Sequence, residues 1–242
     1  MTAFFYAWRF VGLVQKIRVN PSVVALPPLC RSSVADLREK PVLYFGKSGG
    51  IMPVDYDFIR NILENFEGKG ICRGYVPKDK KGNALGNSGV TIGTGVDLGQ
   101  QSGTRLLAMG VPERVLHKLR PYLGLRGQEA ITRLESAPLL LSDGEIETLD
   151  EAVIGSYIRE VATRYGIQFG RKGAFASLPR QVQAVLVSLR YHLGFAGFPK
   201  TWDMLLKRDY SGAISELENP QRWGNKYMSR RKSEAGLLRE VL

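Results

Sequence analysis

Two short stretches of the N-terminal half carry residues that could do acid–base chemistry. Glu67 closes a helical pattern and is followed by glycines, while Thr91 and Asp97 lie six residues apart (97 − 91 = 6) in a glycine-rich run. A helix C-terminus carries partial negative charge, which disfavours an ionised carboxylate and suits a proton donor. An aspartate and a threonine facing such a glutamate can hold and activate a water molecule. Position alone does not distinguish Glu67 from an exposed glutamate at a helix end.

The glycine-rich run Ser88–Gly99 admits two interpretations. Its glycines at positions 93, 95 and 99 follow the pattern G-x-G-x-x-x-G, which departs from the dinucleotide fingerprint, and no P-loop lysine follows. The alternative is a strand–turn–strand in which the glycines let the backbone approach a ligand. The mismatch favours the second interpretation over a nucleotide site.

The elements that must position these residues follow from the hydrophobic pattern. Residues 55–67 carry apolar side chains at helical spacing. Glycines punctuate residues 73–98 between short β-like pieces, which indicates a small antiparallel sheet. The later chain has helical patterns, and Ser142-Asp143-Gly144-Glu145 matches a capping box. Further helices are expected at residues 177–194, 201–207, 211–217 and 226–239. The fold class is therefore α+β, with a small sheet and a mostly helical lobe.

Residues 1–51 differ from the rest and are expected to be a leader and linker outside the fold, which makes residues 52–242 one domain. Residues 4–14 are apolar, but the positive charges fall inside or after this stretch, whereas a secretory signal carries them before it. A Sec signal is therefore not expected. The run Lys47-Ser48-Gly49-Gly50 has the composition of a linker.

The composition of the 242-residue chain limits the classes of partner that the protein is expected to bind. A net charge of +11, from 34 Lys and Arg minus 23 Asp and Glu, attracts polyanions such as nucleic acid, anionic lipid or the bacterial wall. No apolar run reaches the roughly 18–20 residues of a membrane-spanning helix, so no stable membrane insertion is expected. Basic residues are not interleaved with aromatics on one face, which argues against nucleic acid. Two cysteines and two histidines favour no metal site.

Local charge runs carry less information than the net charge. The acidic stretch of residues 143–151 is explained as well by a solvated helix face as by a functional role. The same holds for the basic tail from Lys200 onward, whose densest run is Arg230-Arg231-Lys232. His117 and His192 lie on expected helices and are interpreted as packing or capping residues rather than catalytic ones.

The motifs together resemble a known family. The run from Glu67-Gly68 through Gly74-Tyr75-Val76-Pro77 to Ser88-Gly-Val-Thr-Ile-Gly-Thr-Gly-Val-Asp-Leu-Gly-Gln100 resembles the lysozyme-like toxin domain of pesticin-type bacteriocins. That group is similar in turn to the phage-type lysozymes. Arg120-Pro121-Tyr122-Leu123-Gly124 and the helical patterns after Ser177 agree with this. The resemblance covers residues 54–242.

The resemblance implies a lysozyme-like fold and muramidase activity, which is hydrolysis of the β-1,4 bond between N-acetylmuramic acid and N-acetylglucosamine in peptidoglycan. It implies that Glu67 is the catalytic proton donor. It also implies that Thr91 and Asp97 hold and polarise a water molecule. Tyr75 and Ser88 are the candidates for substrate binding, with Tyr75 able to stack on a sugar. Inversion at the anomeric carbon is implied, and neither metal nor organic cofactor is expected.

Asp97 is the position at which this sequence departs from the phage lysozymes. Those enzymes usually carry the aspartate before the threonine, where Leu85 stands here, whereas the pesticin-like group places it six residues after. Asp79 is the alternative carrier and is interpreted as a solvated turn residue. If Asp97 is structural, the assignment of the base fails while that of the acid, Glu67, survives.

The biological role follows from the resemblance and from the charge. We expect an antibacterial effector, secreted or delivered to the periplasm of a target cell, which acts as a monomer on peptidoglycan glycan strands; a phage-derived lysin is the other route that fits. A periplasmic immunity protein is the expected protein partner. Two alternatives stay open: a catalytically inactive peptidoglycan-binding module of the same fold, and a basic nucleic-acid-binding protein.

Overall fold

The computed structural model describes residues 42–45, 51–68 and 70–242. The segment predicted as a leader lies mostly outside these residues, and the extent of the predicted domain stays a prediction. The described chain forms two compact units. One contains residues 67–153, and the other contains the described residues up to Phe66 together with Ile154–Leu242. The first carries the residues singled out above for acid–base chemistry.

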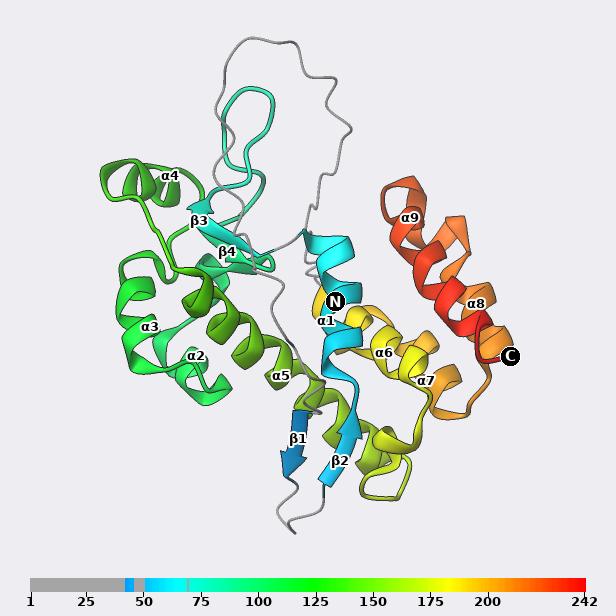
Figure 1. Cartoon of the computed structure of the whole chain (residues 1–242). Helices are drawn as coiled ribbons and strands as arrows, with labels where there is room; N and C mark the ends of the chain where they lie inside the picture. The colour runs from blue at the N-terminus through cyan, green and yellow to red at the C-terminus, as the bar shows by residue number, and fades with distance from the viewer. Residues whose placement is uncertain (1–41, 46–50, 69) are drawn as a thin grey trace, which may run out of the picture. The chain divides into compact units, whose positions relative to one another are not determined.

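The unit of residues 67–153 contains a three-stranded antiparallel sheet in the order β3-β4-β5, of which β3 and β4 are labelled in Figure 1. Its strands are β3 (Ile71–Tyr75), β4 (Thr91–Gly93) and β5 (Val96–Asp97). Short helices follow, namely η1 (Leu98–Gln100), α2 (Gly103–Met109), α3 (Glu113–Leu119), η2 (Arg120–Tyr122) and α4 (Gly127–Ser136). The glycine punctuation therefore predicted the small sheet correctly, and its strands are shorter than the average strand.

The long helix α5 (Asp143–Gln168) begins at the predicted capping box. The Ser142 N–H donates to Glu145 Oε2 at 2.8 Å, and the Glu145 N–H donates to Ser142 Oγ at 3.3 Å. Lys118 of α3 lies 2.7 Å from Glu145 Oε1. Hydrogen bonds from Lys118 and from the Ser142 N–H lower the pKa of Glu145. The capping box is confirmed, and the same carboxylate also ties α3 to the start of α5.

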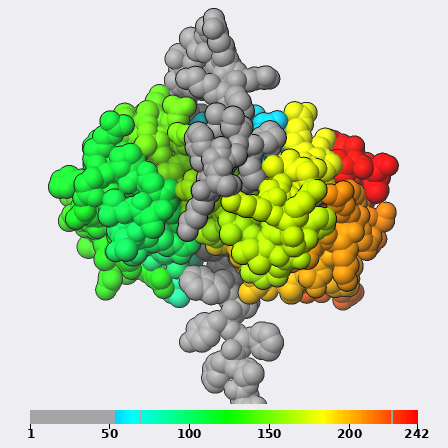
Figure 2. Space-filling model, turned by 90° about the horizontal axis from the view of Figure 1, so that it is seen from below, coloured from blue at the N-terminus to red at the C-terminus, as the bar shows by residue number. Residues whose placement is uncertain are grey.

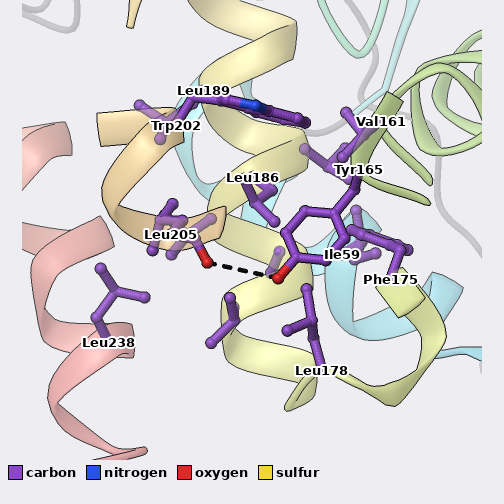
Figure 3. Close-up of a cluster of buried hydrophobic side chains, with 14 of the residues drawn as sticks. Ile59, Val161, Tyr165, Phe175, Leu178, Leu186, Leu189, Trp202, Leu205 and Leu238 are labelled. Carbon is purple, nitrogen blue, oxygen red and sulfur yellow. Dashed lines mark hydrogen bonds between the residues drawn. The ribbon is translucent and has the colours of Figure 1, made fainter. Parts of the chain in front are cut away.

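The other unit is mainly helical. Its elements are β1 (Val42–Phe45), β2 (Ile51–Val54), α1 (Tyr56–Glu67, up to Phe66), α5 from Ile154, η3 (Ala174–Ser177), α6 (Arg180–Leu193), η4 (Phe195–Gly197), α7 (Pro199–Leu206), α8 (Tyr210–Leu217) and α9 (Pro220–Arg239). Tyr165 of α5 lies at the centre of its core, against Phe175 and Trp202 (Figure 3). Its hydroxyl lies 3.5 Å from the carbonyl oxygen of Leu205, which it can reach only as a long hydrogen bond.

Helices α8 and α9 pack side by side, as the orange and red segments of Figure 2 show. Asn219 caps α9 by accepting from the Gln221 N–H at 3.0 Å, and Pro220 occupies the first turn. Gly224, with φ of +62°, breaks the helix soon after it begins. The sequence pattern predicted the helix only from residue 226, because this break interrupts the periodicity that precedes it.

The described elements confirm the α+β fold class, with a small antiparallel sheet and a larger number of helices. The predicted helix of residues 55–67 ends at the predicted residue. Within the described part of the chain, no helix has the length and the apolar character needed to cross a membrane.

Candidate active site

Glu67 is the last residue of α1 and is half-buried. Gly68 follows with φ of +93°, the left-handed conformation in which many helices end and which glycine adopts without steric cost. On the facing β4–β5 turn, a β-carbon added to Gly95 would lie 3.4 Å from Glu67 Cβ and 3.5 Å from its Oε2. Gly95 also has a positive φ, of +76°. A side chain at this residue would touch Glu67, so the β4–β5 turn faces the Glu67 side chain at Gly95.

The three strands place Tyr75, Thr91 and Asp97 in one row. Tyr75 of β3 is the cross-strand partner of Thr91 in β4, and Thr91 is the partner of Asp97 in β5. Directly opposed residues of an antiparallel pair project to the same face, with β-carbons about 5 Å apart. The register of the sheet therefore brings together three of the residues selected from the sequence.

Asp97 is buried, and its carboxylate ties the backbone just after β5 to the backbone just before β4. Oδ1 accepts from the N–H of Gly99 at 2.8 Å and from the N–H of Gly89 at 3.1 Å. A β-carbon on Gly89 would lie 2.5 Å from Gly99 Cα, so this close approach requires glycine at residue 89. Burial raises the pKa of Asp97, against the opposing effects of the two N–H donors and of Arg126. The carboxylate is thus more basic than an ordinary aspartate.

Tyr75 lies within the electrostatic reach of both carboxylates. Burial raises the pKa of its phenol, and the charges of Glu67 and Asp97 raise it further. The phenol therefore keeps its proton at neutral pH and is available as a hydrogen-bond donor. Thr91 is buried, and it lies between Tyr75 and Asp97 in the row. Its hydroxyl is 3.5 Å from the carbonyl oxygen of Gly89. Because this contact is long for a hydrogen bond, the hydroxyl can also bind another partner.

Ser88 and Asp79, the remaining candidates from the sequence, lie in the chain between β3 and β4. The described contacts of Ser88 are backbone ones, since its N–H donates to Leu85 O and its carbonyl accepts from the Gly127 N–H. They anchor the glycine-rich run to the start of α4 and do not connect its side chain to the row. Asp79 is exposed and accepts from the N–H groups of Lys81 and Asn83, which makes it a turn residue. The hydrogen bonds of Asp79 therefore stabilise the turn in the loop between β3 and β4.

Comparison with protein families gives a match to a known toxin family. The pesticin family, described as the bacterial toxin homologue of phage lysozyme, C-terminal part, matches residues 53–211. The chain belongs to this family. No curated protein matches it with significance. The match includes Glu67 and the whole row, and it ends before α9.

Membership of the pesticin family identifies the chain as a lysozyme-type antibacterial toxin, for which peptidoglycan is the implied substrate. Among the described residues there is no group of three or more His, Cys, Asp and Glu side chains that could hold a metal ion.

One residue of this pesticin-family site escaped the sequence analysis. Asp150, in the acidic stretch for which a solvated face was an equal alternative, is 1% exposed, and its carboxylate reaches the β4–β5 turn. A signal was present in the sequence, because Asp150 lies one helical turn from both Ile146 and Val153. A lone carboxylate on an apolar stripe must find a partner, since a buried unpaired charge is costly.

Proposed function

We propose that this protein is a muramidase that hydrolyses the β-1,4 bond between N-acetylmuramic acid and N-acetylglucosamine in peptidoglycan. The observation that carries the proposal is the gathering of Glu67, at the end of α1, with the in-register row Tyr75, Thr91 and Asp97. Acid–base hydrolysis of a glycoside requires two carboxyl groups, and the Thr91 hydroxyl lies beside one of them in the row. Membership of a family of phage-lysozyme homologues supports the same chemistry.

Each side chain has one role in the proposed mechanism. Glu67, protonated, donates its proton to the glycosidic oxygen as the bond to the leaving sugar breaks. Asp97, ionised, accepts a proton from the attacking water, and the Thr91 hydroxyl orients that water. Tyr75 keeps its phenolic proton and can donate it in a hydrogen bond to a sugar oxygen.

Replacing Asp97 with asparagine tests its role as the base. The amide oxygen can still accept from the N–H groups of Gly89 and Gly99, while the charge is removed. We expect turnover to fall by about 10²–10⁴-fold, the usual contribution of general acid–base catalysis. We expect the melting temperature at neutral pH to be retained or raised, because the raised pKa of Asp97 means that its ionised form costs stability in the folded protein. Turnover and thermal unfolding measured side by side decide whether Asp97 is catalytic, and full activity would make it a structural residue.

The pH dependence of the wild type gives a second test of Asp97. Because the base must be ionised, activity is lost as the pH falls through the pKa of Asp97, which burial raises above its ordinary value. The acid limb of kcat/KM is therefore expected at a higher pH than the value of about 3.9 for an unperturbed aspartate. In the same pH window the stability cost of Asp97 disappears as the pH falls, since a raised folded-state pKa favours the protonated form. An acid limb that is identical in Asp97→Asn would contradict the assignment.

The proposed activity is tested by incubating purified sacculi with the wild-type protein and measuring the release of soluble fragments. Release of disaccharide-peptides is the expected result. Sedimentation of the protein with intact sacculi, without any release of fragments by a folded sample, would instead identify an inactive wall-binding module. Salt-sensitive binding to DNA without wall hydrolysis would identify a nucleic-acid-binding protein.

We further propose that the protein acts as a monomeric effector, secreted or delivered to the periplasm of the target cell. The net charge of +11 supports action at the cell wall, because a basic surface concentrates an enzyme on an anionic wall. A producing cell then needs an immunity protein in its own periplasm. Co-purification with the products of neighbouring genes is expected to recover an inhibitor of wall hydrolysis, and recovery of none would count against the effector role.

A further inference from the structure

A buried carboxylate from α5 holds the β4–β5 turn by two hydrogen bonds to one residue. The Thr94 N–H donates to Asp150 Oδ1 at 2.9 Å, and the Thr94 hydroxyl donates to Asp150 Oδ2 at 2.8 Å. Asp150 is 1% exposed and Thr94 is 0% exposed. Hydrogen bonds to an ionised acceptor are roughly twice as strong as neutral ones, and a pair to one residue also fixes its orientation. The turn is thus clamped to α5.

The backbone around Asp150 is shaped to admit this carboxylate. A β-carbon on Gly93, where φ is +62°, would lie 2.6 Å from Asp150 Oδ1. A β-carbon on Gly70 would lie 3.3 Å from Oδ2 and 2.9 Å from Ile146 Cγ2. Each glycine leaves space that the carboxylate or its neighbour on α5 fills.

The opposite side of the same turn lies against Glu67. Gly95 follows Thr94 directly, and the position of its missing β-carbon is 3.4 Å from Glu67 Cβ and 3.5 Å from Oε2. The segment of Gly93, Thr94 and Gly95 is therefore held by Asp150 at one residue and faces Glu67 at the next. A shift of Thr94 would move Gly95 toward or away from the Glu67 side chain.

We propose that Asp150 is a positioning residue for the catalytic acid: it holds the β4–β5 turn at the place where Gly95 faces the side chain of Glu67. This inference rests on the proposed function, in which Glu67 donates the proton. Asp150 does not touch the reacting atoms. It acts on the geometry of proton transfer, for which a misplacement of about 1 Å can cost about 10²-fold in rate.

The first test compares Asp150→Asn with Glu151→Gln, its exposed neighbour on the same helix. Asparagine keeps the size of the side chain and an oxygen for the Thr94 N–H but loses the charge. We expect kcat on soluble glycan fragments to fall by about 10–100-fold in Asp150→Asn, with KM unchanged, and no change in Glu151→Gln. Rates are expressed per folded molecule, measured by near-ultraviolet circular dichroism. A kcat equal to that of the wild type would overturn the proposal, whatever the change in stability.

A milder variant covers the case in which Asp150→Asn does not fold. Thr94→Val removes the hydroxyl donor and keeps the N–H, so it should lower kcat by a smaller factor, whereas Thr94→Ser should restore the rate. Loss of kcat in Thr94→Val with rescue in Thr94→Ser supports the clamp. Equal rates in both variants would contradict it.

A readout that does not need catalysis separates this inference from the proposed function. The carboxyl ¹³C resonance of Glu67, assigned by comparison with Glu67→Gln, reports the surroundings of its side chain at a fixed pH. We expect Asp150→Asn and Thr94→Val to shift this resonance, and Glu151→Gln to leave it in place. A wild type without wall hydrolysis would disprove the proposed function, while an unmoved Glu67 resonance would disprove the positioning role.

Discussion

Replacing Glu67 with glutamine is expected to lower turnover on peptidoglycan by about 10²–10⁴-fold while sedimentation with sacculi and thermal stability are retained. Glutamine has nearly the shape of the acid and still fits against Gly95, but it has no acidic proton to give to the leaving glycosidic oxygen. Because the side chain is half-buried and its contact with the turn is kept, the expected loss is one of chemistry rather than of folding.

The matched control is Glu64→Gln, one turn earlier on the same helix. Glu64 pairs with Arg60 at 2.8 Å, a contact of the i, i+4 type that stabilises a helix by about 0.2–0.5 kcal/mol. We expect this variant to keep full turnover. Equal losses in the two variants would show that the helix end, rather than an acid at residue 67, is what the activity needs.

Among the proposed variants, Glu234→Ala is expected to lose the most unfolding free energy. Glu234 and Arg231 are both 0% exposed, and Arg231 Nη1 lies 2.8 Å from Glu234 Oε2, in ion contact without the alignment of a hydrogen bond. Ser188 of α6 donates to Glu234 Oε1 at 2.6 Å. Breaking a buried ion pair by removing one of its partners typically costs about 3–5 kcal/mol.

The unfolding free energy of Glu234→Ala, measured by urea titration, should fall by this amount. A surface control is Glu218→Ala, which loses a pair with the half-exposed Arg239 and should cost at most about 1 kcal/mol. The double variant Arg231→Met, Glu234→Leu should recover most of the loss, since apolar replacement of a buried ion pair is often neutral. A change below about 1 kcal/mol in Glu234→Ala would contradict a structural role for the pair.

The helices could be predicted because their signals are local. The end of α1, the capping box of α5 and the glycine at residue 194 that ends α6 all lie within a few residues of the boundary they set. The start of α9 was missed by six residues (226 − 220 = 6), although Asn219 and Pro220 are ordinary helix-start residues. The positive φ of Gly224 separates them from the periodic part of the helix.

The site could be predicted in its residue types but not in its geometry. The motif around Thr91 suggested which side chains to consider, and the sheet places Tyr75, Thr91 and Asp97 in register. That register includes an irregularity between Ile71 and Tyr75, which an alternating pattern cannot foresee. Asp150 was not singled out because its partner, Thr94, lies 56 residues away and only the folded chain brings them together.

Muramidase activity is tested most directly by the chemical identity of the ends that the enzyme creates. Sacculi are digested with the wild type, reduced with borohydride, and the soluble fragments are analysed by mass spectrometry. We expect reduced muramic acid at the new ends, and none after incubation with Glu67→Gln. Reduced glucosamine at the new ends, or cleavage within the peptide stems, would contradict a muramidase centred on Glu67.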